Sequence, residues 1–423
     1  MILSLTILFF WILLIVTIYL FKDYLHPAII FCLPWCVFLS VLRKTGYAFD
    51  SNSYVYLYFL LGGVIFVIGT TLGNRIVVKD KRITNRIQSY YPNYFFLKTL
   101  IVFDILFTIY TLVSYYRFIR ANYVENFFIS FYMNKAEFGA FGFISYGRNV
   151  VLATVLCMLI GYSHVPEDEK KKYKKYLVVQ TFFYFALAMT KMTRNGILSS
   201  ILPIVTAIII VSKARNKTII KWVIAGGLGF IALFSVVSVY KSPYLYKNNN
   251  VIDVLLRQFS LYGTGGFVAF QKKFDSNLFQ HLGGKNTART LLAIYDAVFG
   301  TNYAPPLIQE YTVIGNDSVT NVYTFYYWYT SDFGIIYALF IQFIIGIFHG
   351  KIYRQMTEYK LMGIYNYCIF LYPLIMQIFQ DQYFSLLSNW IQLLVFGILL
   401  LKTNILFSRK TENKSNFVWY INE

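Results

Sequence analysis

Three arginines stand where a guanidinium group can bind an anion at the edge of an apolar segment. Arg194 lies in the short turn 191–196 between two apolar stretches, Arg148 opens another, and Arg257 precedes the glycine-rich segment Gly263–Gly266. A charge beside hydrocarbon is costly unless it is paired or hydrated, and the planar fork of arginine binds phosphate oxygens in pairs. We interpret the three arginines as candidate phosphate-binding residues, with snorkelling of the side chain to the membrane interface as the alternative.

Three acidic residues surround an aromatic run, Asn321–Tyr329, and are the candidate proton acceptors: Glu310, Asp317 and Asp332. A carboxylate within reach of a sugar hydroxyl can accept its proton in a transition state. Aromatic rings with interspersed polar groups suit sugars, so the run as a whole is a candidate sugar-binding surface. Two alternatives stay open: the rings form an aromatic belt at the membrane interface, and Asp332 caps the helix that follows it.

Other kinds of site lack the spacing that their chemistry needs. The four histidines and four cysteines form no cluster with metal-ligand spacing, and every cysteine falls within an apolar stretch, as a small buried side chain does. The glycine-rich segment lacks the Gly-Lys-Ser/Thr ending of a phosphate-binding loop, and no Gly-x-Ser-x-Gly hydrolase motif occurs. We therefore expect no metal and no cofactor.

The elements that must position these residues are membrane helices. Of the 423 residues, 57% are hydrophobic and 13% are charged, where a soluble domain carries about 25% charged residues. A helix needs about 20 mostly apolar residues to cross a bilayer, and such windows recur along the chain. We predict an all-α, polytopic transmembrane bundle of eleven spans, with ten to twelve as the range. The expected helices are 2–21, 27–42, 53–72, 94–116, 148–164, 176–191, 196–212, 218–239, 332–350, 361–379 and 385–402.

The basic residues predict the orientation of this bundle. Five lysines between Lys170 and Lys175 mark that loop as cytoplasmic, because positive loops stay inside. Alternation places five more segments on the same side: 22–26, 73–93, 213–217, 351–360 and the C-terminal tail. The cytoplasmic segments hold more than half of the 38 basic residues, so the net charge of +19 indicates membrane topology and not nucleic-acid binding. Arg43 and Lys44, placed outside, are the exception.

The predicted spans divide the chain into four segments: helices one to eight (1–239), a long external loop (240–331), the C-terminal helices (332–402) and a cytoplasmic tail (403–423). The external loop is too long for a turn and too rich in apolar and aromatic residues for disorder. Val251–Phe259 and Asn286–Phe299 have apolar residues at helical spacing, so we expect short helices there that lie on the membrane surface.

Three of these features resemble the bacterial oligosaccharide repeat unit polymerases, the Wzy or O-antigen polymerase family. They are the turn Thr193-Arg-Asn-Gly196, the long external loop, and Asn321-Val-Tyr-Thr324 followed by Asp332-Phe-Gly334, which opens a helix ending in Gly346-Ile-Phe-His-Gly350. The resemblance covers essentially the whole chain. It implies a GT-C-like bundle that performs inverting, metal-independent glycosyl transfer at the outer face of the bacterial cytoplasmic membrane.

The resemblance also implies substrates, partners and roles. The substrates are undecaprenyl-pyrophosphate-linked oligosaccharide repeat units, joined into an O-antigen or capsule, and the partners are the bilayer, a chain-length regulator and a flippase. Arg194 would bind pyrophosphate, with Asn321, Tyr323 and Asp332 as further site residues, whereas Arg148 and Arg257 are chosen by position alone. Two alternative functions remain: an O-antigen ligase, and a lipid-linked oligosaccharide flippase or other secondary transporter, although no internal repeats are visible.

Overall fold

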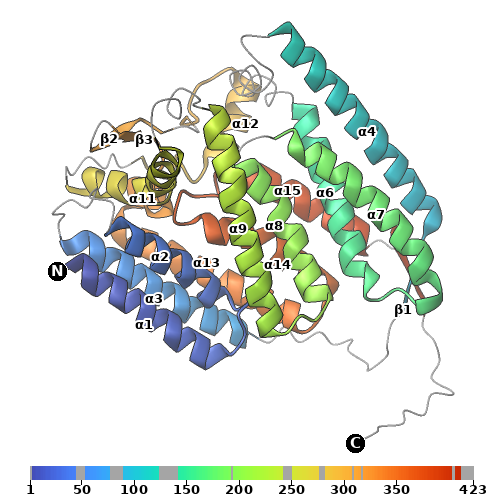
Figure 1. The fold of residues 1–423 in the computed structure, drawn as a ribbon, viewed down its shortest axis with the longest axis horizontal. Helices are drawn as coiled ribbons and strands as arrows, with labels where there is room; N and C mark the ends of the chain where they lie inside the picture. The colour runs from blue at the N-terminus through green and yellow to red at the C-terminus, as the bar shows by residue number, and fades with distance from the viewer. Residues whose placement is uncertain are drawn as a thin grey trace, which may run out of the picture.

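The computed structural model is all-helical apart from two small two-stranded sheets in the part of the chain that it describes. The described residues are 2–43, 53–76, 89–122, 142–191, 194–241, 250–275, 282–306, 309–315, 318–402 and 405–410. Figure 1 shows the long helices side by side in one bundle, with α11, α12 and the β2–β3 hairpin at one end of it.

Each of the eleven ranges expected to be helical is a helix, although several bounds shift. The helices are α1 (Ile2–Phe21), α2 (Pro27–Leu42), α3 (Ser53–Arg75), α4 (Tyr94–Ala121), α6 (Gly142–Tyr162), α7 (Glu167–Met189), α8 (Arg194–Val211), α9 (Asn216–Lys241), α13 (Phe325–Thr357), α14 (Leu361–Met376) and α15 (Leu387–Lys402). Within the described residues, five helices are long and apolar enough to cross a membrane: α1, α3, α4, α6 and α13. The all-α expectation is therefore confirmed, and the five apolar helices indicate a membrane protein, whereas the eleven spans stay a prediction.

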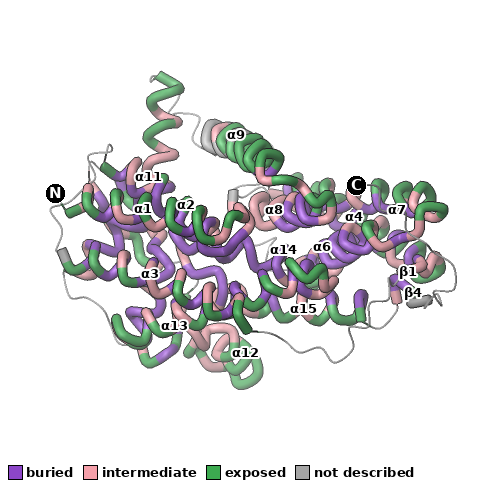
Figure 2. Tube along the Cα trace, turned by 90° about the horizontal axis from the view of Figure 1, so that it is seen from below, coloured by how far each residue is buried: buried purple, intermediate pink, exposed green. Residues whose placement is uncertain are grey.

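The outer faces of the bundle are apolar. Large apolar side chains on α1 are more than half exposed, among them Leu5, Leu8 and Ile15. Figure 2 shows buried residues through the middle of the bundle and exposed ones on the outer faces of α1, α9 and α12. Contiguous apolar surface of this kind is stable against hydrocarbon and unfavourable in water.

The closest helix contact lies between α3 and α13 and is made by glycines. A Cβ atom at Gly73 would lie 2.1 Å from the carbonyl oxygen of Ile347, and one at Gly350 would lie 2.2 Å from that of Thr70. Small residues four apart let helix backbones approach directly in a membrane. The segment Gly346–Gly350, singled out as a family-like motif, is thus a packing surface in this structure.

The segments predicted to be cytoplasmic meet at one end of the bundle. The short strands β1 (Ser89–Pro92) and β4 (Phe407–Lys410) pair in antiparallel fashion, at the opposite end from α12 in Figure 1. Asn216 donates to the carbonyl oxygen of Lys22 (2.8 Å), and the Lys213 ammonium lies 5.3 Å from the ring centroid of Tyr359. Helices that alternate in direction bring their odd-numbered connections to one side, and these are the connections that the charge pattern groups together.

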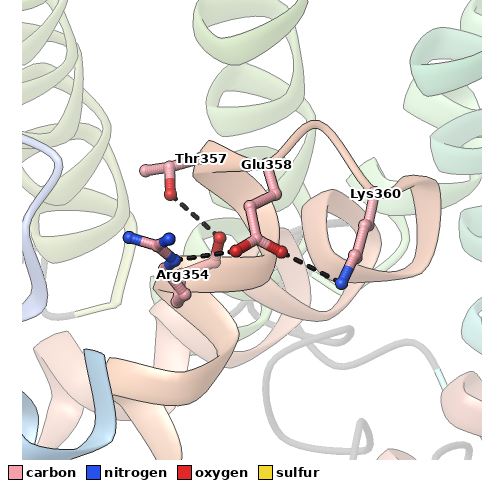
Figure 3. Close-up of polar contacts among 4 residues, drawn as sticks. All are labelled: Arg354, Thr357, Glu358 and Lys360. Carbon is pink, nitrogen blue, oxygen red and sulfur yellow. Dashed lines mark hydrogen bonds and ion pairs between the residues drawn. The ribbon is translucent and has the colours of Figure 1, made fainter. Parts of the chain in front are cut away.

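Charges pair with one another in the turn between α13 and α14, at this end of the bundle (Figure 3). The Glu358 carboxylate accepts from Arg354 Nε (2.7 Å) and lies 3.0 Å from Lys360 Nζ, while Thr357 Oγ1 donates to the carbonyl oxygen of Arg354 (2.9 Å). The hydrogen bond from Lys360, assisted by Arg354, lowers the pKa of the Glu358 carboxyl. Basic residues near a helix C-terminus also favour its dipole.

The opposite end carries the folded part of the expected external loop: α11 (Val251–Asp275), α12 (Arg289–Phe299) and the strands β2 (Thr312–Gly315) and β3 (Ser318–Thr320). Both short helices expected here exist, but α11 continues to Asp275 and its residues 263–271 are buried. A Cβ atom at Gly263 would lie 2.2 Å from the Phe38 ring. The glycine-rich segment therefore allows helix packing and is not an open phosphate-binding loop.

Helix α13 begins at Phe325, seven residues before the expected start at Asp332, and the φ of +81° at Gly334 kinks it. The expected boundary between the external loop and the C-terminal spans thus falls at this kink. Phe325, Tyr326 and Tyr329 precede the kink and are completely buried. Most of the aromatic run is consequently interior packing, which neither the belt nor the sugar-binding interpretation anticipated.

Candidate functional site

Two cations lie together where α6 and α7 meet. Arg148, on α6, donates from Nη2 to Thr190 Oγ1 (2.7 Å), and its Nε is buried without a hydrogen-bond partner. Lys191 directly follows Thr190, and burial together with the nearby Arg148 charge lowers its pKa to about 8. No acidic side chain in the described residues forms an ion pair with either cation. A pair of positive groups with spare donors can bind an anion such as a phosphate.

Polar contacts surround this cation pair. The neighbouring Asn149 donates from Nδ2 to Gln392 Oε1 (2.7 Å) and to Asn389 Oδ1 (3.3 Å), which joins α6 to α15. Tyr262 of α11 donates its hydroxyl to Asn195 Oδ1 at the start of α8. The pair therefore lies at the end of the bundle that carries α11 and α12, bordered by α6, α7, α8 and α15.

Two of the residues predicted from the sequence, Arg194 and Asp317, lie partly or wholly outside the described residues. Helix α8 begins at Arg194, so a helix N-terminus lies three residues after Lys191 in the sequence. The positive end of a helix dipole favours an anion there. The side chain of Arg194 and the whole of Asp317 lie outside the described residues, and their roles stay predictions.

Arg257 belongs to a different part of this end. Its Nη2 lies 3.4 Å from Ser318 Oγ, so α11 is linked to the β2–β3 hairpin by this side chain. The described contact of Arg257 is thus with the hairpin and not with Arg148. Its expected role in phosphate binding gains no geometric support from the described contacts.

Asp332 is buried, with 3% of its surface exposed, and its carboxylate is occupied. Oδ1 accepts from the Asn286 backbone N–H (3.1 Å), and Oδ2 accepts from the N–H and the Oγ1 of Thr287 (both 2.7 Å). These bonds fasten the segment before α12 to the kink of α13. Helix α13 consists of two helices joined at the non-helical Gly334, and Thr324 holds the N-cap position of the first. The hydrogen bonds described for the Asp332 carboxylate go to the segment before α12 and not to the helix that follows Gly334. The capping role of Asp332 stays a prediction.

The hairpin candidates have contrasting environments. The Glu310 side chain is 89% exposed and lies 3.6 Å from Lys273 Nζ. Tyr323 is 1% exposed and donates its hydroxyl to the Glu310 carbonyl oxygen (3.0 Å), while its ring stacks on Tyr327 at 4.3 Å. Asn321 is half-buried. Tyr323 therefore supports the hairpin from within and has no free face for a sugar.

Asp381 is a buried carboxylate whose setting the sequence reading did not anticipate. It lies in the segment 377–386 between α14 and α15 and is 2% exposed. It accepts from the hydroxyl of Tyr329 (2.7 Å) and from the backbone N–H groups of Tyr383 (2.9 Å), Phe384 (3.1 Å) and Ser385 (2.9 Å). The polar run Gln377–Gln382 between two apolar helices was the available signal, but it resembled an ordinary exposed turn.

The segment 377–386 also contacts both α11 and α12. The Phe379 ring packs on Tyr262 at a centroid distance of 4.9 Å, and Thr290 Oγ1 lies 3.5 Å from the Phe384 carbonyl oxygen. Asp381, by holding this segment, indirectly supports α11 and α12 through these contacts.

Comparison with known proteins adds nothing to this geometry: no family model, no curated protein and no solved structure matches the chain.

Proposed function

We propose that this chain is a GT-C-like glycosyltransferase that polymerises undecaprenyl-pyrophosphate-linked repeat units into a surface polysaccharide. In this proposal all eleven helices cross the bacterial cytoplasmic membrane, with α11 and α12 outside and the C-terminus in the cytoplasm. The distribution of basic residues and the gathering of the Lys- and Arg-rich connections at one end support that orientation.

The observation that carries the proposal is the pair Arg148 and Lys191. Both lie between apolar helices at the end with the folded external segment, and no described acidic group neutralises them. Both side chains are half-buried, cations beside hydrocarbon are stabilised by a counter-ion, and a pyrophosphate on a lipid carrier supplies one where hydrocarbon meets water. Arg194, at the start of α8, would add a third cation from the adjoining turn.

The reaction follows from this placement. A hydroxyl oxygen of the acceptor repeat unit attacks the anomeric carbon of the donor glycan, and the bond from that carbon to the pyrophosphate oxygen breaks. The cations stabilise the charge that develops on the departing pyrophosphate. A carboxylate takes the proton of the acceptor hydroxyl. We assign that step to Glu310 or Asp317, because the Asp332 carboxylate already accepts from three donors.

The test is the surface glycan of a deletion strain complemented with the wild-type chain, with Arg148→Ala or with Arg354→Ala. We expect single repeat units in place of polymer for the deletion and for Arg148→Ala, and normal polymer for Arg354→Ala, which removes a cation from the opposite end. Lipid-linked polymer that accumulates without transfer would indicate a ligase. Repeat units trapped at the cytoplasmic face would indicate a flippase.

A further inference from the structure

A second cationic feature lies on the outer surface of α4, at the end where the lysine-rich segments meet. A shallow groove there is lined by Tyr94, Phe95, Lys98, Thr99 and Val102. Positions four apart share a helix face, so the groove follows the first turns of α4 along its axis. Phe95 is 74% exposed and Val102 is 55% exposed. The groove is therefore open toward the surroundings of the bundle and mostly apolar.

One rim of the groove carries a second lysine, from α7. Lys172 Nζ lies 3.7 Å from the ring centroid of Tyr94, a cation–π distance. The Tyr94 hydroxyl donates to Glu169 Oε2 (2.5 Å), so this carboxylate is engaged by the tyrosine. Lys98 and Lys172 are both exposed, and neither forms an ion pair with a described residue.

The surrounding charge favours an anion despite the nearby acids. Glu167, Asp168 and Glu169 open α7, but five lysines follow them before residue 176, and Lys170 is already paired with Glu167. Lys98 lies one turn inside α4, which is one of the helices long and apolar enough to cross a membrane. An ammonium group at that depth reaches the level of lipid headgroups.

We propose that this groove binds one anionic phospholipid, with its phosphate between Lys98 and Lys172 and an acyl chain along Phe95 and Val102. The exposed apolar wall requires an occupant with a hydrocarbon chain, and the two cations require a negative headgroup. A zwitterionic lipid would fill the groove but present its phosphate with a competing positive charge. The proposal depends on a membrane-spanning α4 and is independent of glycosyl transfer.

The test is native mass spectrometry of the full chain in detergent, titrated with phosphatidylglycerol or with phosphatidylcholine. The variant is the double change Lys98→Gln and Lys172→Gln. Its matched control is Lys213→Gln and Lys221→Gln, because Lys213 also lies over a tyrosine ring and Lys221 also follows a helix start, at the same end but away from the groove. A second variant, Thr99→Trp, fills the groove and keeps both lysines.

We expect the dissociation constant for one phosphatidylglycerol to rise roughly thirtyfold in the lysine variant, since each lysine near an anionic headgroup contributes about 1 kcal/mol. It should also rise in Thr99→Trp and stay unchanged in the control pair. An equal loss in the control pair would mean diffuse charge attraction and would overturn the site. So would equal binding of phosphatidylcholine, or displacement of the lipid by millimolar inorganic phosphate.

Discussion

The turn between α13 and α14 and the region around Asp332 and Arg148 handle charge in opposite ways. At that turn, at the end with the β1–β4 sheet, Glu358 is neutralised near the surface by Arg354 and Lys360. At the other end, Asp332 is buried and satisfied by N–H and O–H donors, while Arg148 has no described acidic partner. The donors that satisfy Asp332 carry no charge, so the positive charge of Arg148 is not used to neutralise that acid. It therefore remains available to a ligand.

The removal of one unpaired cation should have the largest effect. Arg148→Ala should lower polymer formation per folded molecule roughly 100-fold, because a donor aimed at developing negative charge is lost. Arg148→Lys should be nearly as damaging, because an ammonium cannot reproduce the fork that reaches both Thr190 and a phosphate. The measurement is polymer length and yield in membranes at equal protein level. Normal polymer from the alanine variant would show that Arg148 is not part of the site. Arg148 and the paired charges around Glu358 would then not differ in function.

The same reasoning predicts a strong effect of pH on the second cation. Because its pKa is lowered to about 8, Lys191 is charged below that pH and becomes neutral above it. Donor binding by the free protein should therefore weaken roughly tenfold between pH 7 and pH 9. Lys191→Arg, which stays charged, should remove most of this dependence. Binding of a lipid pyrophosphate at several pH values checks it, and an identical pH profile for the two proteins would contradict the assignment.

Asp332 is buried with its hydrogen bonds satisfied, so we expect its substitution to lower the stability of the fold and not the rate of polymer formation. Asp332→Asn presents an amide group to donors that need an acceptor, which should destabilise the fold by about 2 kcal/mol. We expect a lower melting temperature in detergent, with polymer formed per folded molecule almost unchanged. Full stability with lost polymerisation would instead make Asp332 the proton acceptor.

The smallest effect is expected at the end with the β1–β4 sheet, where Glu358 is paired with basic residues. Glu358→Gln removes a surface ion pair, which contributes about 0–1 kcal/mol because water and salt screen it. Thermal unfolding should shift by a degree or two at low salt and not at all in 1 M salt, and polymer should be normal. A large loss of activity would show that the two ends are coupled.

The helices, and which of their connections share an end, were predictable from the sequence for a physical reason. An apolar run of about 20 residues in a bilayer must satisfy its own backbone, so length and composition determine the helices. The clustering of Lys and Arg determined which connections share an end, and the contacts of Asn216 with Lys22 and of β1 with β4 agree. Helices over Val251–Phe259 and Arg289–Phe299 followed from periodicity alone.

The roles of individual polar residues depended on tertiary structure. Asp332 resembled a base or a cap, and its donors, Asn286 and Thr287, proved to come from a segment 45 residues away. Lys191 was an unremarked turn residue until Arg148 was found beside its neighbour Thr190. The aromatic run near Tyr326 resembled a surface feature, although it packs inside. Partners distant in the sequence decide whether a charge is neutralised or free, and no local pattern encodes that pairing.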